Sequence, residues 1–165
     1  MTRGLFIGRF QPFHNGHLKD VRDALREVGE LVIGIGSSNE SRTKENPFTA
    51  AERKEMIAQT LRQQGIPMIS IYNVPDIGDD ALWVAHVIGI VGDIDRVYTG
   101  NQHTRVLFEE KGIAVKQVDF LKGVEGTIVR DAIADKRPWK HLVPKGTLGV
   151  MQRIGGEAII HNSLS

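Results

Sequence analysis

The fold is decided by residues 5–28, which read LFIGRFQPFHNGHLKDVRDALREV. Residues 5–8 are a short apolar run that predicts a buried strand. A loop rich in Gly, Pro and His follows, and apolar residues then recur on one helical face at Leu18, Val21, Leu25 and Val28. Gly29 supplies a plausible helix stop. The stretch therefore predicts a strand followed by a helix.

The same alternation continues along the chain. Further strands are expected at 31–35, 69–74, 96–99 and 114–118, and further helices at 49–62, 82–91, 101–111 and 127–134. Short apolar strands separated by helices predict a doubly wound, Rossmann-like α/β fold, with a parallel sheet of about five strands covered on both faces. Ligands of such sheets bind at the carboxyl ends of the strands. The corresponding loops lie at Gly8, Gly36, Asp76 and Gly100.

Length and composition narrow the class of protein. A chain of 165 residues predicts a single domain, residues 1–165, with 144–165 as a C-terminal appendage. Its 21 Lys and Arg against 20 Asp and Glu leave a net charge of +1, so no basic field attracts nucleic acid or anionic lipid. Without cysteines, a leader or a long apolar span, we expect a cytoplasmic protein with neither nucleic-acid nor membrane partners.

The loop after the first strand carries the main functional signal. Its residues 8–17, GRFQPFHNGH, place His14 and His17 at a helix amino terminus, where free N–H groups and the helix dipole favour an anion. Arg9 can reach a phosphate, and Gly16 removes a side chain where a nucleotide can lie against the backbone. Nucleotidyl transfer needs this positioning and neutralisation and no covalent intermediate.

Two plainer interpretations compete for the histidine pair. Two histidines at a helix start can be a half-buried surface pair, and a His-x-x-His spacing can supply half of a metal site. The other histidines are scattered and complete no obvious ligand set: His86, His103, His141 and His161. The position directly after a strand also weakens the surface interpretation.

At these residues the chain resembles a known family. The run from His14 to His17 is similar to the HxGH signature of the nucleotidyltransferase superfamily, and residues 8–17 resemble archaeal-type nicotinamide-nucleotide adenylyltransferases. Four further segments agree in order, extending the resemblance over roughly residues 3–144. They are 46–53 (NPFTAAER), 76–77 (DI), 81–86 (ALWVAH) and 126–130 (GTIVR).

The resemblance implies transfer of AMP from ATP, with Mg²⁺ carried on the nucleotide and no protein metal site. It implies that the catalytic residues are His14, His17 and Arg130. It implies that the ATP-binding residues are Gly8, Arg9, Phe10, His14, Gly16, His17, Gly100, Asn101, Gly126, Thr127, Ile128 and Arg130. Asn101 is equally a plain helix cap, and the Gly126-Thr127 helix start can bind the β- and γ-phosphates.

The acceptor implied is nicotinamide mononucleotide, which the enzyme converts to NAD with release of pyrophosphate. The acceptor-binding residues implied are Arg42, Lys44, Asp76, Ile77, Asp80 and Trp83. The indole of Trp83 suits a cationic nicotinamide ring, although a tryptophan at a helix start is more often a core residue. The family often has asparagine where this chain has Asp80. It also implies a homo-oligomer, commonly a hexamer.

Glu125 is a departure from the family, which usually has serine before the Gly-Thr pair. A carboxylate beside a triphosphate is unfavourable unless it points away or meets a metal ion. We expect it to face away from the site; neutralisation by Lys122 is an alternative that would likewise leave ATP binding unaffected.

Two alternative functions remain. One is an adenylyl- or cytidylyltransferase for another acceptor, such as pantetheine phosphate, a flavin or glycerol phosphate; the pairing of Trp83 with Asp76 argues against it. The other is a nucleotide-sensing module without turnover, which the intact histidines, Arg9 and Arg130 disfavour.

Overall fold

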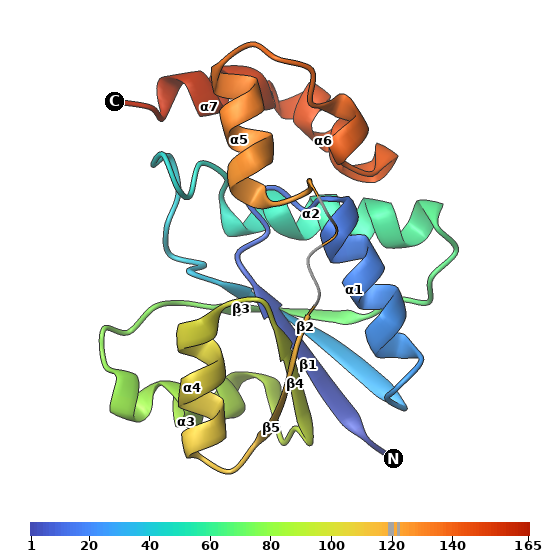
Figure 1. The fold of residues 1–165 in the computed structure, drawn as a ribbon, viewed down its shortest axis with the longest axis vertical. Helices are drawn as coiled ribbons and strands as arrows, with labels where there is room; N and C mark the ends of the chain where they lie inside the picture. Colours follow the sequence, from blue (N-terminus) through green and yellow to red (C-terminus); the bar gives the residue numbers. More distant parts are fainter. Residues whose placement is uncertain (119–120, 122) are drawn as a thin grey trace.

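The computed structural model describes residues 1–118, 121 and 123–165, and it has the expected alternation of strands and helices (Figure 1). The strands are β1 (Arg3–Gly8), β2 (Glu30–Gly36), β3 (Ser70–Val74), β4 (Arg96–Thr99) and β5 (Ala114–Gln117). The helices before the C-terminal region are α1 (Asn15–Leu25), α2 (Ala50–Gln63), α3 (Asp80–Val91), α4 (Gln102–Glu110) and α5 (Gly126–Ala134). Every strand and helix predicted up to residue 134 is confirmed, with ends that differ by a few residues.

All five strands are parallel, in the order β3-β2-β1-β4-β5. The chain winds outward from β1 first through β2 to β3, and then through β4 to β5 on the other side. This is the doubly wound, Rossmann-like topology, and its switch in direction lies between β1 and β4. The carboxyl ends of these two strands are therefore where a ligand site is expected.

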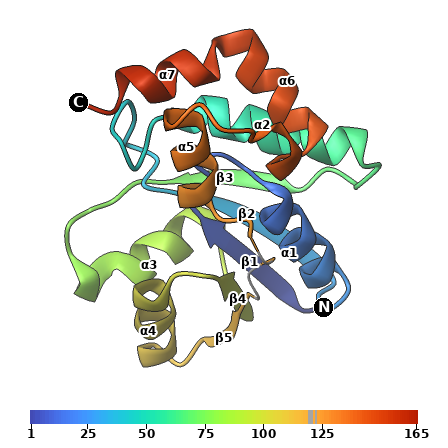
Figure 2. The ribbon, with the colours of Figure 1, turned by 45° about the horizontal axis from the view of Figure 1, so that its top comes forward.

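The two faces of the sheet bury separate sets of side chains, because successive strand residues point to opposite faces. On β1, Leu5 and Ile7 pack with residues of α3 and α4, whereas Phe6 packs with residues of α1, α2 and α5. Figures 1 and 2 show α3 and α4 on one side of the sheet and the remaining helices on the other.

The C-terminal residues, expected as a short appendage, form a short 3₁₀ helix and two further helices. These are η1 (Lys140–Leu142), α6 (Lys145–Ile154) and α7 (Gly156–Asn162). Helix α6 packs against α2, and α7 packs against α5 and α6 (Figure 2). Val150 and Ile160 are buried in the same core as Phe6, so these helices thicken the layer on that face. No described helix is long and apolar enough to cross a membrane.

Candidate active site

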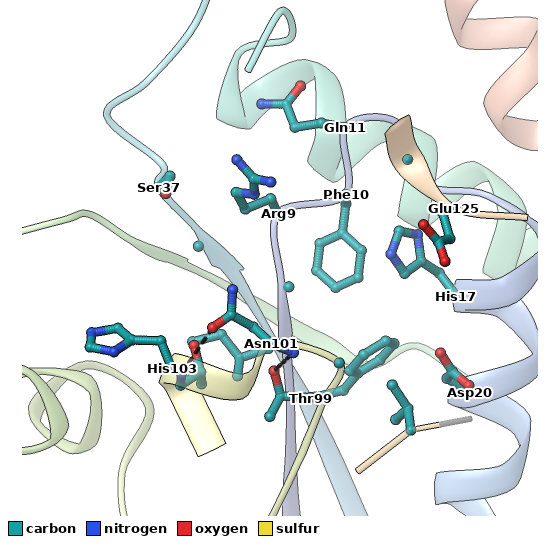
Figure 3. Close-up of a pocket in the computed structure, with 18 of the residues that line it drawn as sticks. Arg9, Phe10, Gln11, His17, Asp20, Ser37, Thr99, Asn101, His103 and Glu125 are labelled. Carbon is teal, nitrogen blue, oxygen red and sulfur yellow. Dashed lines mark hydrogen bonds between the residues drawn. The ribbon is translucent and has the colours of Figure 1, made fainter. Parts of the chain in front are cut away.

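A cavity of about 550 Å³ opens at the carboxyl ends of β1 and β4, at the switch in strand direction (Figure 3). Its volume is in the range of small-molecule sites. The cavity is lined by all but three of the site residues that the resemblance implies. Those that line it are Gly8, Arg9, Phe10, His14, Gly16, His17, Asp76, Ile77, Asp80, Trp83, Gly100, Asn101, Gly126, Thr127 and Arg130. The topology therefore brings together segments that lie more than a hundred residues apart.

His14 and His17 cap the amino terminus of α1 reciprocally. The backbone N–H of His17 donates to Nδ1 of His14 at 3.3 Å, and the backbone N–H of His14 donates to Nδ1 of His17 at 3.1 Å. This is a capping box in which imidazoles do the work that Ser or Thr and Glu usually do. The two rings stack, with centroids 3.6 Å apart and planes 16° from parallel. The histidines thus build the helix start as well as lining the cavity.

The capping bonds determine which nitrogen of each neutral imidazole carries the proton. Because each Nδ1 accepts a hydrogen bond, the neutral ring carries its proton on Nε2, at the edge away from the capped backbone. Burial, and then the charge of Arg130, lower the pKa of His14 to about 4. Burial, and then His14, hold the pKa of His17 well below its usual range. At neutral pH both imidazoles are uncharged Nε2–H donors.

Gly16 lies where the backbone passes close to its neighbours. A Cβ at this position would lie 3.0 Å from Cε1 of His14 and 3.4 Å from the carbonyl oxygen of Val124. A side chain would press on the histidine ring and on the segment before α5. The glycine therefore allows the start of α1 and the segment before α5 to lie close together.

Arg130 is held against the first loop from α5. Its Nη1 donates to the carbonyl oxygen of Gln11 at 2.9 Å, and its Nη2 contacts Oγ1 of Thr127 at 3.3 Å. A Cβ on Gly126 would lie 2.8 Å from this Nη1, so a larger residue there would displace the end of the Arg130 side chain. Burial, and then Arg9, lower the pKa of Arg130, because two cations share this side of the cavity. An anion on this side of the cavity would lie near both guanidinium groups.

Glu125 also lines the cavity, and Figure 3 shows its side chain beside His17. It is the N-cap residue of α5 but makes no side-chain capping bond. The expectation that this carboxylate faces away from the site is therefore wrong. Lys122, the expected neutralising partner, lies outside the described residues.

One end of the cavity is formed at the start of α3. Asp79 caps the helix through Oδ1, which accepts from the backbone N–H groups of Ala81 and Leu82. The indole of Trp83 is half-buried and packs edge-on against Phe108, with centroids 5.5 Å apart at 71°. One side of this tryptophan contacts the core residue Phe108, and the residue also lines the cavity.

Polar contacts tie α3 to the neighbouring helix α4, and the start of α4 to β4. Nε2 of His103 lies 3.1 Å from Oδ2 of Asp80, joining the amino ends of α3 and α4. Asn101 caps α4 by accepting from the N–H of Thr104 at 2.9 Å, and its own N–H donates to Oγ1 of Thr99 (Figure 3). The plain cap interpretation of Asn101 is confirmed, and the residue also lines the cavity.

Three of the implied residues lie outside the described cavity lining: Arg42, Lys44 and Ile128. Arg42 is engaged by its own loop, since its guanidinium bonds both carboxylate oxygens of Glu52, at 2.7 and 2.9 Å, and the carbonyl oxygen of Pro47. Lys44 is exposed, and the side chain of Ile128 is 37% exposed. The pairing with Glu52 explains why Arg42 is held away from the cavity.

Arg53, at the end of the 46–53 segment, has a structural role that the sequence did not predict. The side chain is 0% exposed and donates hydrogen bonds to five backbone carbonyls. The acceptors are the oxygens of Arg9, Gly36, Ser37, Glu40 and Thr49. Burial, and then Arg9, lower the pKa of Arg53 to about 10, which leaves it charged at neutral pH. One cation thus joins the loops after β1 and β2.

Other residues of the cavity lining were not expected from the sequence. They include Gln11, Asp20, Ser37 and His103 (Figure 3). The amide of Gln11 is 2% exposed and bonds the backbone of Phe48 twice, through Nε2 to its oxygen and through Oε1 from its N–H. A buried amide in a loop leaves no periodic pattern, so only its place inside the 8–17 run could have marked it.

The chain matches known proteins over most of its length. A family model described as cytidylyltransferase-like matches residues 5–132. A nicotinamide-nucleotide adenylyltransferase of Methanococcus aeolicus is 43% identical over 157 residues, covering 94% of this chain and 91% of the relative. One of Methanoculleus marisnigri is 40% identical over 158 residues, covering 94% of both chains.

A solved structure agrees with these matches. A bifunctional NMN adenylyltransferase/ADP ribose pyrophosphatase from Francisella tularensis, complexed with AMP and a manganese ion, superposes with a TM-score of 0.79 at 25% identity. The match covers 99% of this chain and 52% of that one, so this chain spans about half of the bifunctional protein. On the fold, the family match and the identity to its relatives, the chain belongs to the cytidylyltransferase-like family, among the nicotinamide-nucleotide adenylyltransferases.

Proposed function

We propose that the protein transfers AMP from ATP to nicotinamide mononucleotide, forming NAD and pyrophosphate. A phosphate oxygen of the mononucleotide attacks the α-phosphorus of ATP, and the bond from that phosphorus to the bridging oxygen of the β-phosphate breaks. The observation that carries the proposal is the pair of neutral Nε2–H imidazoles, built into a helix amino terminus on the wall of a nucleotide-sized cavity.

The proposed roles follow from charge and position. His14 and His17 donate to the phosphate oxygens on which charge grows, and they do so without a proton change because both are neutral. Arg9 and Arg130 supply the positive charge that a triphosphate needs. The amino end of α5 adds free backbone N–H groups near Gly126. Positioning and electrostatics then account for the chemistry, and no side chain forms a covalent bond to the substrate.

A divalent cation bound to the triphosphate is part of this proposal, with Mg²⁺ as the ion. Among the described residues no group of three or more metal-ligating side chains comes together. The Glu125 carboxylate, one of several that line the cavity, lies at the amino end of α5, where it would contact a cation carried by the nucleotide. The cation supplies charge neutralisation of the phosphates when it is bound.

The experiment that tests the activity is incubation of the purified protein with ATP, Mg²⁺ and nicotinamide mononucleotide, followed by enzymatic detection of NAD. Parallel reactions offer nicotinate mononucleotide, pantetheine phosphate, flavin mononucleotide or glycerol phosphate, with ATP or CTP. NAD formed from the mononucleotide with ATP supports the proposal. Turnover with a different acceptor only, or nucleotide binding without pyrophosphate release, overturns it.

We further propose that the protein acts in the cytoplasm as a homo-oligomer, as the family resemblance implies. The absence of cysteine fits a reducing compartment. Light scattering on the purified protein measures its molar mass, and hence the number of copies, directly.

Replacing Trp83 by alanine is expected to raise KM for the mononucleotide and to leave KM for ATP nearly unchanged. A cationic ring on an indole gains about 0.5–2 kcal/mol, which corresponds to a rise of about 2- to 30-fold. Trp83→Phe retains a ring against Phe108 and is expected to have a smaller effect. Steady-state kinetics with each substrate varied in turn provide the measurement. An alanine variant that unfolds and is not restored by saturating mononucleotide would show that the residue serves the core only.

Replacing Glu125 by serine is expected to tighten ATP binding several-fold at low magnesium and low salt. The carboxylate lines the cavity, and repulsion between it and the triphosphate is least screened under these conditions. Glu125 is the N-cap residue of α5, so the loss of its favourable interaction with the helix dipole should lower the free energy of unfolding by about 0.3–1 kcal/mol, less the stabilisation that a serine cap supplies. Titration calorimetry with a non-hydrolysable ATP analogue measures the affinity, and equal affinities for both forms would contradict the inward orientation.

A further inference from the structure

The residue before the first histidine is held by a helix from the other end of the chain. Oγ1 of Thr147, on α6, donates a hydrogen bond to the carbonyl oxygen of Phe13 at 2.8 Å. Both residues are 0% exposed. Because both residues are buried, no water molecule can replace the Thr147 hydroxyl as the donor to this carbonyl. The bond therefore fixes the position of Phe13 relative to α6.

The carbonyl of Phe13 needs this donor. The backbone bonds of α1 begin one residue later, where the N–H of Leu18 donates to the oxygen of His14 at 3.1 Å. Phe13 therefore lies just outside the helix, and Thr147 is the donor recorded for its oxygen among the described residues. The ring of Phe13 in turn stacks on His17, with centroids 5.5 Å apart and planes 20° from parallel. A shift of this residue is thus transmitted to the histidine pair.

The depth at which α6 sits is set by a glycine. A Cβ on Gly146 would lie 2.4 Å from the backbone nitrogen and 2.6 Å from Cα of Thr60, on α2. The backbones of α6 and α2 therefore touch at this point, and any larger residue would lift α6 away (Figures 1 and 2 show the two helices side by side). This contact places the hydroxyl of Thr147 at bonding distance from the loop.

A second bond reaches the other side of His14 from the same region. Nδ2 of Asn15 donates to the carbonyl oxygen of His141, in η1, at 2.9 Å. The residues immediately before and after His14 are thus both bonded to residues 141–147. The family match ends at residue 132, so these contacts come from a part of the chain beyond it.

We infer that the C-terminal region, through Thr147, positions the catalytic histidines for phosphoryl chemistry. Thr147 is a positioning residue: it touches neither substrate nor reacting atoms and acts through Phe13 on His14 and His17. The inference rests on the proposed function for its kinetic test. It predicts that loss of the hydroxyl alone weakens catalysis more than substrate binding, because misplaced donors lose most when charge develops in the transition state.

The main variant is Thr147→Val, which keeps the shape and removes the hydroxyl. We expect kcat to fall about tenfold with little change in KM for ATP, since a displacement of catalytic groups by up to 1 Å can reduce rates about a hundredfold. Thr147→Ser restores the hydroxyl and should restore kcat. The matched control is Thr60→Val: Thr60 is also 0% exposed, and its hydroxyl donates to the Met56 carbonyl within α2. It sits under α6 without bonding the histidine loop, so kcat should stay near that of the unchanged protein.

A spectroscopic measurement separates this inference from the proposed activity. Nitrogen chemical shifts of the imidazoles report which ring nitrogen carries the proton, with or without turnover. In the unchanged protein we expect both rings as Nε2–H tautomers, and in Thr147→Val a mixture of tautomers and broadened signals. If the unchanged protein makes no NAD, the proposed function fails while this measurement still tests the positioning.

Two results would overturn the inference. One is Thr147→Val with unchanged kcat and unchanged imidazole shifts. The other is an equally reduced kcat in Thr147→Val and Thr147→Ser, which would show that the hydroxyl is not what positions the histidines. If the valine variant does not fold, Thr147→Ser and Thr147→Ala differ by the hydroxyl alone, and equal kcat for these two would overturn the inference in the same way.

Discussion

Replacing His17 by alanine is expected to lower kcat about a hundredfold, the loss seen when one donor to a developing oxyanion is removed, while KM for ATP changes little. The reason lies in the capping geometry. With Nδ1 of His17 accepting from the backbone N–H of His14, the neutral ring carries its proton on Nε2. That donor contributes most when negative charge grows in the transition state. Single-turnover kinetics with saturating ATP and mononucleotide measure the loss directly.

The capping role of His17 requires a structural control, because alanine also removes the acceptor for the His14 N–H. Loss of a helix cap lowers the free energy of unfolding by about 0.5–2 kcal/mol. Glutamine is a natural third residue of a capping box, so His17→Gln should keep the stability of the unchanged protein. It removes the imidazole, and kcat should remain strongly reduced. A glutamine variant with normal kcat would show that His17 serves the helix start and not the reaction.

The parts of the site that could be predicted from the sequence lie on short, ordered stretches of chain. The βα alternation placed the loops at Gly8 and Gly100 on one edge of a parallel sheet, because parallel strands end on the same side. The His14-Asn-Gly-His17 run lies at a helix start, where local geometry already brings the two rings together. The place of Arg130 beside Gly126 and Thr127 could be predicted because residues three and four apart lie on the same face of a helix.

What could not be predicted depends on contacts between distant segments. The orientation of Glu125 is set by how α5 meets the first loop, through the bond from Arg130 to the Gln11 carbonyl. Arg42 is removed from the cavity by Glu52, a partner ten residues away across an irregular loop. Thr147 reaches Phe13 across 134 residues. Neither periodicity nor motif spacing carries information on such pairings.

The buried guanidinium of Arg53 is the other place where a single change should have a large effect. Replacing it by methionine is expected to lower the free energy of unfolding by at least about 3 kcal/mol, since each buried carbonyl left without a donor costs about 1–3 kcal/mol. Methionine keeps the length and the apolar stem but supplies no N–H group. It removes five hydrogen bonds to carbonyl oxygens; those of Ser37 and Thr49 keep a backbone donor, whereas those of Arg9 and Glu40 lose the donor they have in this structure. Urea denaturation followed by circular dichroism measures the change.

Lys54→Met is the matched control for Arg53→Met, because it removes a cation from the next residue of the same helix, where the side chain is exposed. Surface changes of this kind usually alter the free energy of unfolding by no more than about 0.5 kcal/mol. Arg53→Lys keeps the charge but has three donors for five carbonyls, so its free energy of unfolding should lie between those of Arg53→Met and Lys54→Met. Equal stability of Arg53→Met and Lys54→Met would mean that the five bonds contribute nothing net. A large loss confined to Arg53 would instead show that one buried cation holds the loops after β1 and β2 together, so that two loops that line the cavity depend on a residue that lies outside its lining.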